Sequence, residues 1–251
     1  MRRSLLSLAS LTVFVSSAHA DVAGVWAGVN YWNYDIDGTA RYKTGNSAND
    51  IDVNDDLGYD DGSSTVIYAA LEHPVPLIPN VRLVYTDIDE NANGRMSQTV
   101  VYGDTIFLAN EQVSSLVELK TTDVTLYYSV LDNVVNLDLG LTAKYIDSKA
   151  RITGQVSGSE DANISVWVPM VYAGVGFDLP LSGLSLSADG SAVGYSGSTF
   201  YDVTVRAAYQ TPWLLGFDVG YRQLSLDLDD VDDSFANVDF SGPYAGAYLH
   251  F

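Results

Sequence analysis

Apolar and polar residues alternate along much of the chain. In the stretch 135–145 the apolar row is Val135, Leu137, Leu139, Leu141, Ala143 and Tyr145. A second row, in 201–209, is Tyr201, Val203, Val205, Ala207 and Tyr209. In both stretches the intervening positions are mostly polar, and aromatic residues lie at or near the ends of the apolar row. A period of two residues predicts β-strands that bury one face in an apolar medium.

The same alternation, less regular elsewhere, predicts strands near 22–35, 63–72, 80–89, 115–130, 134–147, 163–178, 183–195, 199–210, 214–227 and 237–251. Short connections are expected at 73–80, 131–134, 179–183 and 211–213. Connections that are on average longer or more polar are expected at 36–62, 90–114, 148–162, 196–198 and 228–236. Within the second of these, residues 96–109 are predicted to form a separate hairpin beyond the main sheet.

About ten strands with alternating short and long connections predict a closed antiparallel transmembrane β-barrel. Each predicted strand supplies the ~9–11 residues that a tilted crossing needs. Closure also explains the chain end, "SGPYAGAYLHF", whose apolar row continues to Phe251: the last strand is expected to pair with the first, around "VAGVWAGVNYW". The alternative is an exported soluble β-barrel or sandwich, in which the apolar rows would point inward.

The N-terminal residues have the pattern of a secretory signal peptide. Arg2 and Arg3 precede an apolar run from Leu5 to Val15, which is followed by Ala18-His19-Ala20. The predicted division is therefore a signal peptide at 1–20 and a single barrel domain at 21–251. Removal of the two arginines takes the formal charge from −20 to −22. So acidic a chain is not expected to bind nucleic acid, and the absence of cysteine excludes disulfides and thiol chemistry.

The sequence predicts no catalytic, cofactor or metal site. After the signal peptide the only histidines are His73 and His250, both near short connections or the chain end. A carboxylate could still act as a general base. In "DIDVNDDLGYDD", Asp50, Asp52 and Asn54 have EF-hand spacing, but Asp55 replaces the required glycine. This segment and "LDLDDVDD" at 226–233 are interpreted as a solvated acidic rim, with weak Ca²⁺ or Mg²⁺ binding as the alternative.

Charged residues on the faces opposite the apolar rows are expected to lie inside the barrel, because Arg or Lys facing lipid at mid-depth costs ~2–4 kcal/mol. The turn "TPW", centred on Pro212, predicts opposed residues whose numbers sum to 424. That register places Arg206 opposite Asp218 and Asp202 opposite Arg222. The expected result is a lumen plugged by ion pairs, and the alternative is a narrow, cation-preferring conduit.

Several segments resemble a family of small single-domain Gram-negative outer-membrane β-barrel proteins of unassigned function. They are "LEHPVPLIPN", "DLGYDD", "LDNVVNLDLGL", "FDLPLSGLS" and "SLDLDDVDD". The resemblance implies an outer-membrane location and contact with lipids and lipopolysaccharide. It also implies that Phe251 is an assembly signal for the barrel-assembly machinery, although Ala247 stands where an aromatic residue is common. The expected function is a non-enzymatic structural or surface-interaction role. A narrow ion or small-solute channel is the first alternative, and a lipid-modifying enzyme or protease is the second.

Overall fold

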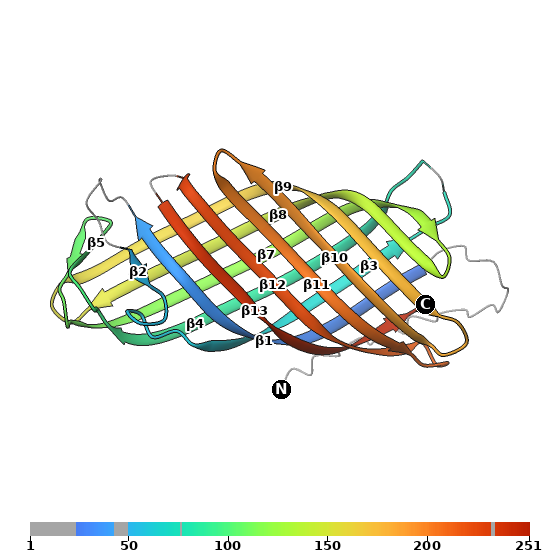
Figure 1. Ribbon diagram of the computed structural model, residues 1–251, viewed down its shortest axis with the longest axis horizontal. Helices are drawn as coiled ribbons and strands as arrows, with labels where there is room; N and C mark the ends of the chain where they lie inside the picture. The colour runs from blue at the N-terminus through green and yellow to red at the C-terminus, as the bar shows by residue number, and fades with distance from the viewer. Residues whose placement is uncertain (1–23, 43–49, 76, 232–233) are drawn as a thin grey trace, which may run out of the picture.

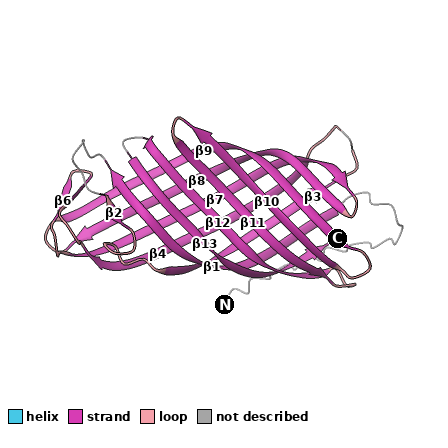
Figure 2. Cartoon of the chain, in the orientation of Figure 1, coloured by secondary structure: helices cyan, strands magenta, loops and turns pink. Residues whose placement is uncertain are grey.

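The computed structural model describes residues 24–42, 50–75, 77–231 and 234–251, so the predicted signal peptide lies outside the described residues. Antiparallel strands form one 11-stranded sheet, and pairing of its last strand with its first closes it into a barrel (Figures 1 and 2). The barrel strands are β1 (Gly24–Tyr42), β3 (Asp61–Glu72), β4 (Asn80–Arg95), β7 (Gln112–Asp132), β8 (Val135–Gly154), β9 (Gly158–Leu179), β10 (Leu184–Tyr195), β11 (Ser198–Gln210), β12 (Leu215–Val231) and β13 (Ser234–His250). The predicted fold class is confirmed.

Three shorter strands lie at one end of the barrel. The two-residue strand β2 (Ile51–Asp52) pairs with β1. Strands β5 (Val100–Tyr102) and β6 (Thr105–Phe107) form a separate two-stranded hairpin, as predicted for 96–109. We call this the capped end, and we call the opposite end, where β1 begins and β13 finishes, the terminal end (Figure 1). Among the described residues, no helix is long and apolar enough to cross a membrane.

Many strands are longer than the alternation predicted, mainly toward the capped end. Residues 148–162, expected to be a long loop, are mostly strand, with only 155–157 between β8 and β9. Most of 228–236 also belongs to β12 and β13. The prediction was wrong because the alternation continues there with the two faces exchanged: apolar residues move from the outward positions to the inward positions. In β8, Leu139 and Leu141 face outward, whereas further along Ile146 and Ile152 are buried inside and Arg151 faces outward.

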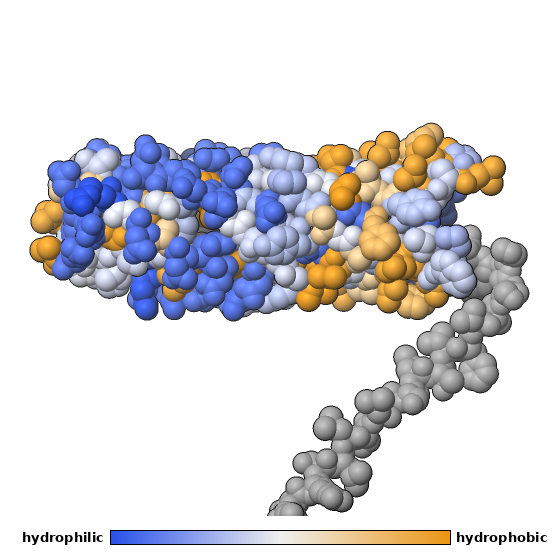
Figure 3. Space-filling view, turned by 90° about the horizontal axis from the view of Figure 1, so that it is seen from below, coloured by the Kyte–Doolittle hydropathy of each residue, from blue (hydrophilic) through white to orange (hydrophobic). Residues whose placement is uncertain are grey.

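This exchange of faces divides the outer surface into two halves. Figure 3 shows an apolar surface toward the terminal end and a hydrophilic surface toward the capped end. On β9 the exposed apolar row runs from Trp167 to Phe177, with exposed fractions of 58% and 44%. Ten residue steps of ~3.3 Å, tilted by ~45°, span a height of ~24 Å. That height equals the apolar band of an outer-membrane barrel, ~25 Å. These apolar rows point outward, whereas the soluble alternative requires them to point inward.

The seam between the first and last strands is paired to the end of the chain. Trp26 lies opposite His250, and pairing continues to Tyr42 opposite Ser234. The backbone N–H of Phe251 donates to the Val25 carbonyl at 2.9 Å, and the Val25 N–H donates back to Phe251 at 3.1 Å. The Phe251 side chain is 52% exposed, so the ring stays accessible at the terminal end. Its role as an assembly signal stays a prediction.

Candidate functional site: the filled lumen

The capped end is covered first by residues 50–60. Asn54 Nδ2 donates to the carbonyls of Ile36 at 2.7 Å and Tyr59 at 2.8 Å. Asp56 Oδ1 accepts a hydrogen bond from the Ser97 N–H at 2.7 Å. Gly58 has a φ of 81°, a conformation that favours glycine. Carboxylates and amides of this segment therefore hold the loop in place. In an EF-hand, side chains at the same spacing would bind Ca²⁺ instead.

Residues 96–111 form the second part of the cover, and together with 50–60 we call them the cap. The Gly103 N–H donates to the Tyr42 carbonyl of β1 at 2.9 Å. On the other side of the barrel, Thr105 Oγ1 donates to Glu160 Oε2 of β9 at 3.1 Å. The β5–β6 hairpin is thus tied to two strands that lie far apart in the sequence.

Glu111 joins the cap to the β8–β9 turn. Its carboxylate accepts backbone hydrogen bonds from Val156 at 2.7 Å, Ser157 at 2.8 Å and Leu108 at 3.0 Å, and a further one from the Ser157 hydroxyl. These donors, the Ser157 hydroxyl first, lower the pKa of Glu111 to about 2. No sequence signal distinguished Glu111 from the other acidic residues, because its partners come from two separate turns.

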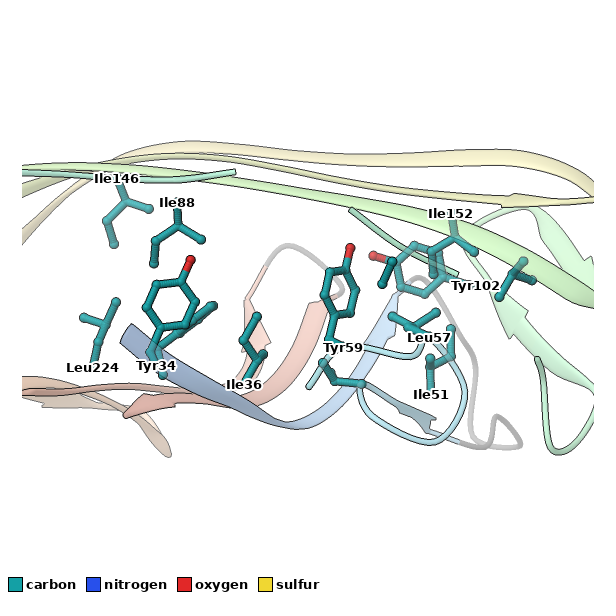
Figure 4. Packing of buried hydrophobic residues seen from close by; sticks show 14 of the residues in the cluster. Tyr34, Ile36, Ile51, Leu57, Tyr59, Ile88, Tyr102, Ile146, Ile152 and Leu224 are labelled. Atoms are coloured by element: carbon teal, nitrogen blue, oxygen red, sulfur yellow. The ribbon is translucent and has the colours of Figure 1, made fainter. Parts of the chain in front are cut away.

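Below the cap, the outer half of the lumen is filled by apolar side chains. Figure 4 shows residues from the cap packing against residues from β1, β4, β8 and β12. The labelled members are Tyr34, Ile36, Ile51, Leu57, Tyr59, Ile88, Tyr102, Ile146, Ile152 and Leu224. Trp32, Ile51 and Ile88 have no exposed surface. The predicted ion pairs therefore share the lumen with an apolar core that the sequence did not predict: outside lipid, the outer wall can be polar, and the inward positions are then apolar.

Next to this core lies a compact group of buried charges at mid-barrel. Arg222 binds Asp202 in a bidentate manner, with Nε–Oδ1 at 2.9 Å and Nη2–Oδ2 at 2.7 Å. Lys144 Nζ donates to Asp202 at 2.9 Å and to Asp123 at 2.7 Å. Arg222 Nη1 also donates to Thr86 Oγ1 at 3.0 Å. Lys144 is completely buried, so its charge depends on these partners.

A second group of charges follows toward the terminal end. Arg82 forms an ion pair with Asp189 and donates to the Tyr172 hydroxyl at 3.3 Å. Arg206 Nη2 lies 3.8 Å from Asp189 Oδ1, and its Nε lies 3.5 Å from Asp218 Oδ2. Together the two groups form what we call the charged layer. It consists of four cationic side chains and four carboxylates: Arg82, Lys144, Arg206 and Arg222 with Asp123, Asp189, Asp202 and Asp218.

The structure brings both predicted residue pairs together, but through a different register. In the β11–β12 hairpin, Arg206 lies opposite Gly220 and Asp202 lies opposite Leu224. The predicted sum of 424 was therefore wrong, and the observed sum is 426. The turn is one residue longer than assumed, because Leu214 adopts a φ of 69° and the Thr211 N–H donates to Leu215. A shift of two in the sum keeps every side chain on its predicted face, so the charges meet diagonally.

Toward the terminal end the lumen opens into a cavity of ≈ 180 Å³. Its walls include Trp26, Tyr127 and Tyr172, together with Glu72 and Asp138. A smaller cavity of ≈ 50 Å³ lies within the charged layer itself. The lumen thus has an apolar core beneath a cap, then a charged layer, then a polar cavity.

The remaining predicted positions lie outside these layers. His73 accepts the Val75 N–H through Nδ1 at 3.2 Å in the β3–β4 connection. His250 stacks on Trp26 with ring centroids 4.1 Å apart. Both histidines are at the terminal end, away from the cap. Of the acidic segment 226–233, the Asp229 N–H donates to Ser198 Oγ at 3.0 Å, while Asp232 and Asp233 lie outside the described residues. In the described part of the chain, no group of three or more His, Cys, Asp or Glu side chains could hold a metal ion.

No family model matches the chain, and no curated protein matches it in sequence. Among solved structures, it is similar to the outer membrane protease OmpT from Escherichia coli, with a TM-score of 0.59 and 12% identity over 91% of this chain and 97% of that one. The translocator domain of autotransporter NalP from Neisseria meningitidis gives a TM-score of 0.45 and 12% identity over 94% and 90%. Ail, the attachment invasion locus protein of Yersinia pestis, gives 0.35 and 9% over 92% and 99%. The likeness to OmpT shows the fold alone: this chain has the β-barrel fold of bacterial outer-membrane proteins.

Proposed function

We propose that the protein is a non-enzymatic outer-membrane barrel whose lumen is closed and whose role is structural or surface-interacting. The observation that carries this proposal is the continuous filling of the lumen by the cap, the apolar core and the charged layer. An open pore needs a wet path, whereas the residues here are paired or packed across the barrel axis. The terminal end would face the periplasm, and the capped half would stand outside the membrane.

The position of the membrane along the barrel follows from the apolar band, and the orientation follows from the connections at the two ends. The 22 residues of β9 rise ~50 Å at ~3.3 Å per residue and a ~45° tilt. About half of that height carries the apolar row, and the other half carries polar outer residues such as Asp161 and Ser165. The two longest connections, which form the cap, lie at the capped end and match the longer extracellular loops of such barrels. The capped half then offers a tall hydrophilic wall to lipopolysaccharide headgroups and to partners outside the cell.

Two observations bear on the enzyme alternative. OmpT is a protease, but a shared fold does not carry an activity. In this chain His73 and His250 lie at the opposite end from the cap, so neither can act with the acidic residues of the capped half. Contact with the barrel-assembly machinery through Phe251 is part of the proposal, and weak divalent-cation binding at the acidic segments is the alternative to a solvated rim.

Solute permeation tests the closed lumen. Liposomes that contain the folded protein should swell in arabinose no faster than empty liposomes, because the charged layer and the apolar core leave no path for a sugar. Heat-dependent migration on a detergent gel confirms that the protein in the liposomes is a folded barrel. Swelling that increases in proportion to the amount of folded protein would favour the narrow-channel alternative.

A further inference from the structure

The cavity at the terminal end has a charge balance that the closed-barrel proposal does not explain. Two cationic side chains line it, Arg82 and Arg206, and both are already paired with carboxylates of the charged layer. Glu72 and Asp138 also line it. Neither of these two has a described cationic side chain within 4.0 Å. The cavity therefore carries two carboxylates without an ion-pair partner, in a partly enclosed space.

The hydrogen bonds of these carboxylates are incomplete. Glu72 accepts one from the Tyr127 hydroxyl at 2.7 Å, and Asp138 accepts one from the Ser129 hydroxyl at 2.7 Å. A carboxylate has about four acceptor positions, so both retain capacity for a donor within the cavity. Neutral hydroxyl donors also leave the charge itself unbalanced.

Among the described residues, neither Glu72 nor Asp138 accepts a hydrogen bond from an N–H group. Asn136, in the same wall, adds no further acceptor: its Nδ2 donates to Asp178 Oδ2 at 2.7 Å, and its Oδ1 has no surface open to the cavity. Buried acceptors usually find a donor, so the two carboxylates call for a ligand that donates hydrogen bonds and carries positive charge.

The rest of the wall is aromatic. Tyr127 and Tyr172 contact each other with ring centroids 5.7 Å apart, and Trp26 stacks on His250 beside them. Aromatic faces attract cations by a further favourable interaction. The volume of ≈ 180 Å³ has space for several water-sized groups.

We propose that this cavity binds a small primary ammonium compound, with its N–H groups donating to Glu72 and Asp138 and its carbon chain lying against Trp26, Tyr127 and Tyr172. The ligand enters from the terminal end and cannot pass the charged layer. That this end faces the periplasm rests on the proposed function, but the binding site itself does not.

Calorimetric titration of the folded protein in a nonionic detergent tests the proposal with three probes. We expect n-butylammonium to bind saturably, tetramethylammonium to bind more weakly because it has no N–H donor, and 1-butanol to show no saturable binding. The variants Glu72→Gln and Asp138→Asn should each weaken n-butylammonium binding at least tenfold. The matched control, Glu118→Gln on the outer face of β7, should bind as the natural protein does.

Heat-dependent gel migration selects the variants that fold, and either single variant suffices for the comparison. Equal binding of 1-butanol, equal binding of tetramethylammonium, no saturable binding of n-butylammonium, or full affinity in a folded Glu72→Gln or Asp138→Asn variant would each overturn the proposal. None of these results depends on whether the barrel conducts. The titration can therefore refute the binding site without refuting the closed lumen, and the swelling assay can do the reverse.

Discussion

Lys144 shows at the scale of single residues what the proposed closure of the lumen depends on. A completely buried ammonium group would be prohibitively costly without partners, and Asp123 and Asp202 supply two. Asp123 lies directly opposite Lys144 on the neighbouring strand and forms no other ion pair within 4.0 Å among the described residues. This pair is therefore suited to testing the energetics of the charged layer.

Replacing Lys144 by methionine should lower the free energy of unfolding by ~3–5 kcal/mol, because Asp123 is left charged and unpaired. The double variant Lys144→Met, Asp123→Leu should recover most of that loss. Urea unfolding in detergent, followed by tryptophan fluorescence, measures both. The same cycle on Arg206 and Asp218 should give a smaller coupling, because Nε and Oδ2 of that pair are 3.5 Å apart, against 2.7 Å between Lys144 and Asp123. Strictly additive losses at Lys144 and Asp123 would mean that the two side chains do not interact.

Glu111 gives the cap a predicted dependence on pH. Its pKa is lowered in the folded protein to about 2, below its ordinary value of ~4.3. The ionised form is therefore the one that stabilises the cap. Its contribution is complete above the ordinary pKa and is lost as the pH falls toward 2.

Amide hydrogen exchange at Val156 and Ser157 follows this loss directly. Protection factors should be constant above about pH 5 and should fall between about pH 4 and 2. Glu111→Gln should show low protection even at neutral pH, and Glu118→Gln should not. Protection in Glu111→Gln that equals that of the natural protein would show that other contacts hold this turn.

At the scale of strands and turns, the sequence predicts the barrel well because alternation of residues records which side faces lipid. The same alternation predicts the capped half poorly. In "KYIDSKARI" (144–152) the inward positions change from charged to apolar as the surroundings change from lipid to water. An alternation that keeps its apolar residues on one face therefore predicts that the strand ends there. The strand itself continues, since both arrangements suit a wall with one polar and one apolar side.

Turn geometry limits what could be predicted of the charged layer. Alternation along β11 and β12 placed Arg206, Asp218, Arg222 and Asp202 correctly on the inward face. The predicted pairs therefore meet, although the turn is one residue longer than assumed. Asp123 and Lys144 could not be paired in this way. A register shift between Ser129 and Leu131 lies between this pair and the β7–β8 turn. No residue pattern predicts that shift, so the pairing could not be counted from the turn. The hairpin of the cap was predicted, but the contacts of the cap were not, because they join segments from three different connections.

The cap depends on close backbone contact at Gly94. A Cβ added there would lie 2.1 Å from the Asp56 carbonyl oxygen, so Gly94→Ala must displace residues 50–60. We expect a loss of ~1–3 kcal/mol and faster cleavage of this segment by proteinase K. Gly194→Ala is the matched control in β10, where the nearest atom would be 3.9 Å away. Equal cleavage rates in the two variants would argue against the close contact between the cap and β4.

At the scale of the whole molecule, the barrel has two halves with opposite construction. The half near the terminal end is apolar outside and charged inside, and the capped half is hydrophilic outside and apolar inside (Figure 3). The charged layer lies where the two meet. This arrangement suits a protein that anchors in a membrane by one half and holds a rigid hydrophilic column above it with the other.

Single-channel recording in planar lipid bilayers tests the closed lumen most directly. With insertion verified by heat-dependent migration of the recovered protein, the natural chain should give no stepwise conductance in 1 M KCl at moderate voltage. The charged layer pairs its four cationic groups internally, and the apolar core above it excludes ions. Regular conductance steps from the natural protein, present with the cap intact and proportional to the amount inserted, would contradict the account.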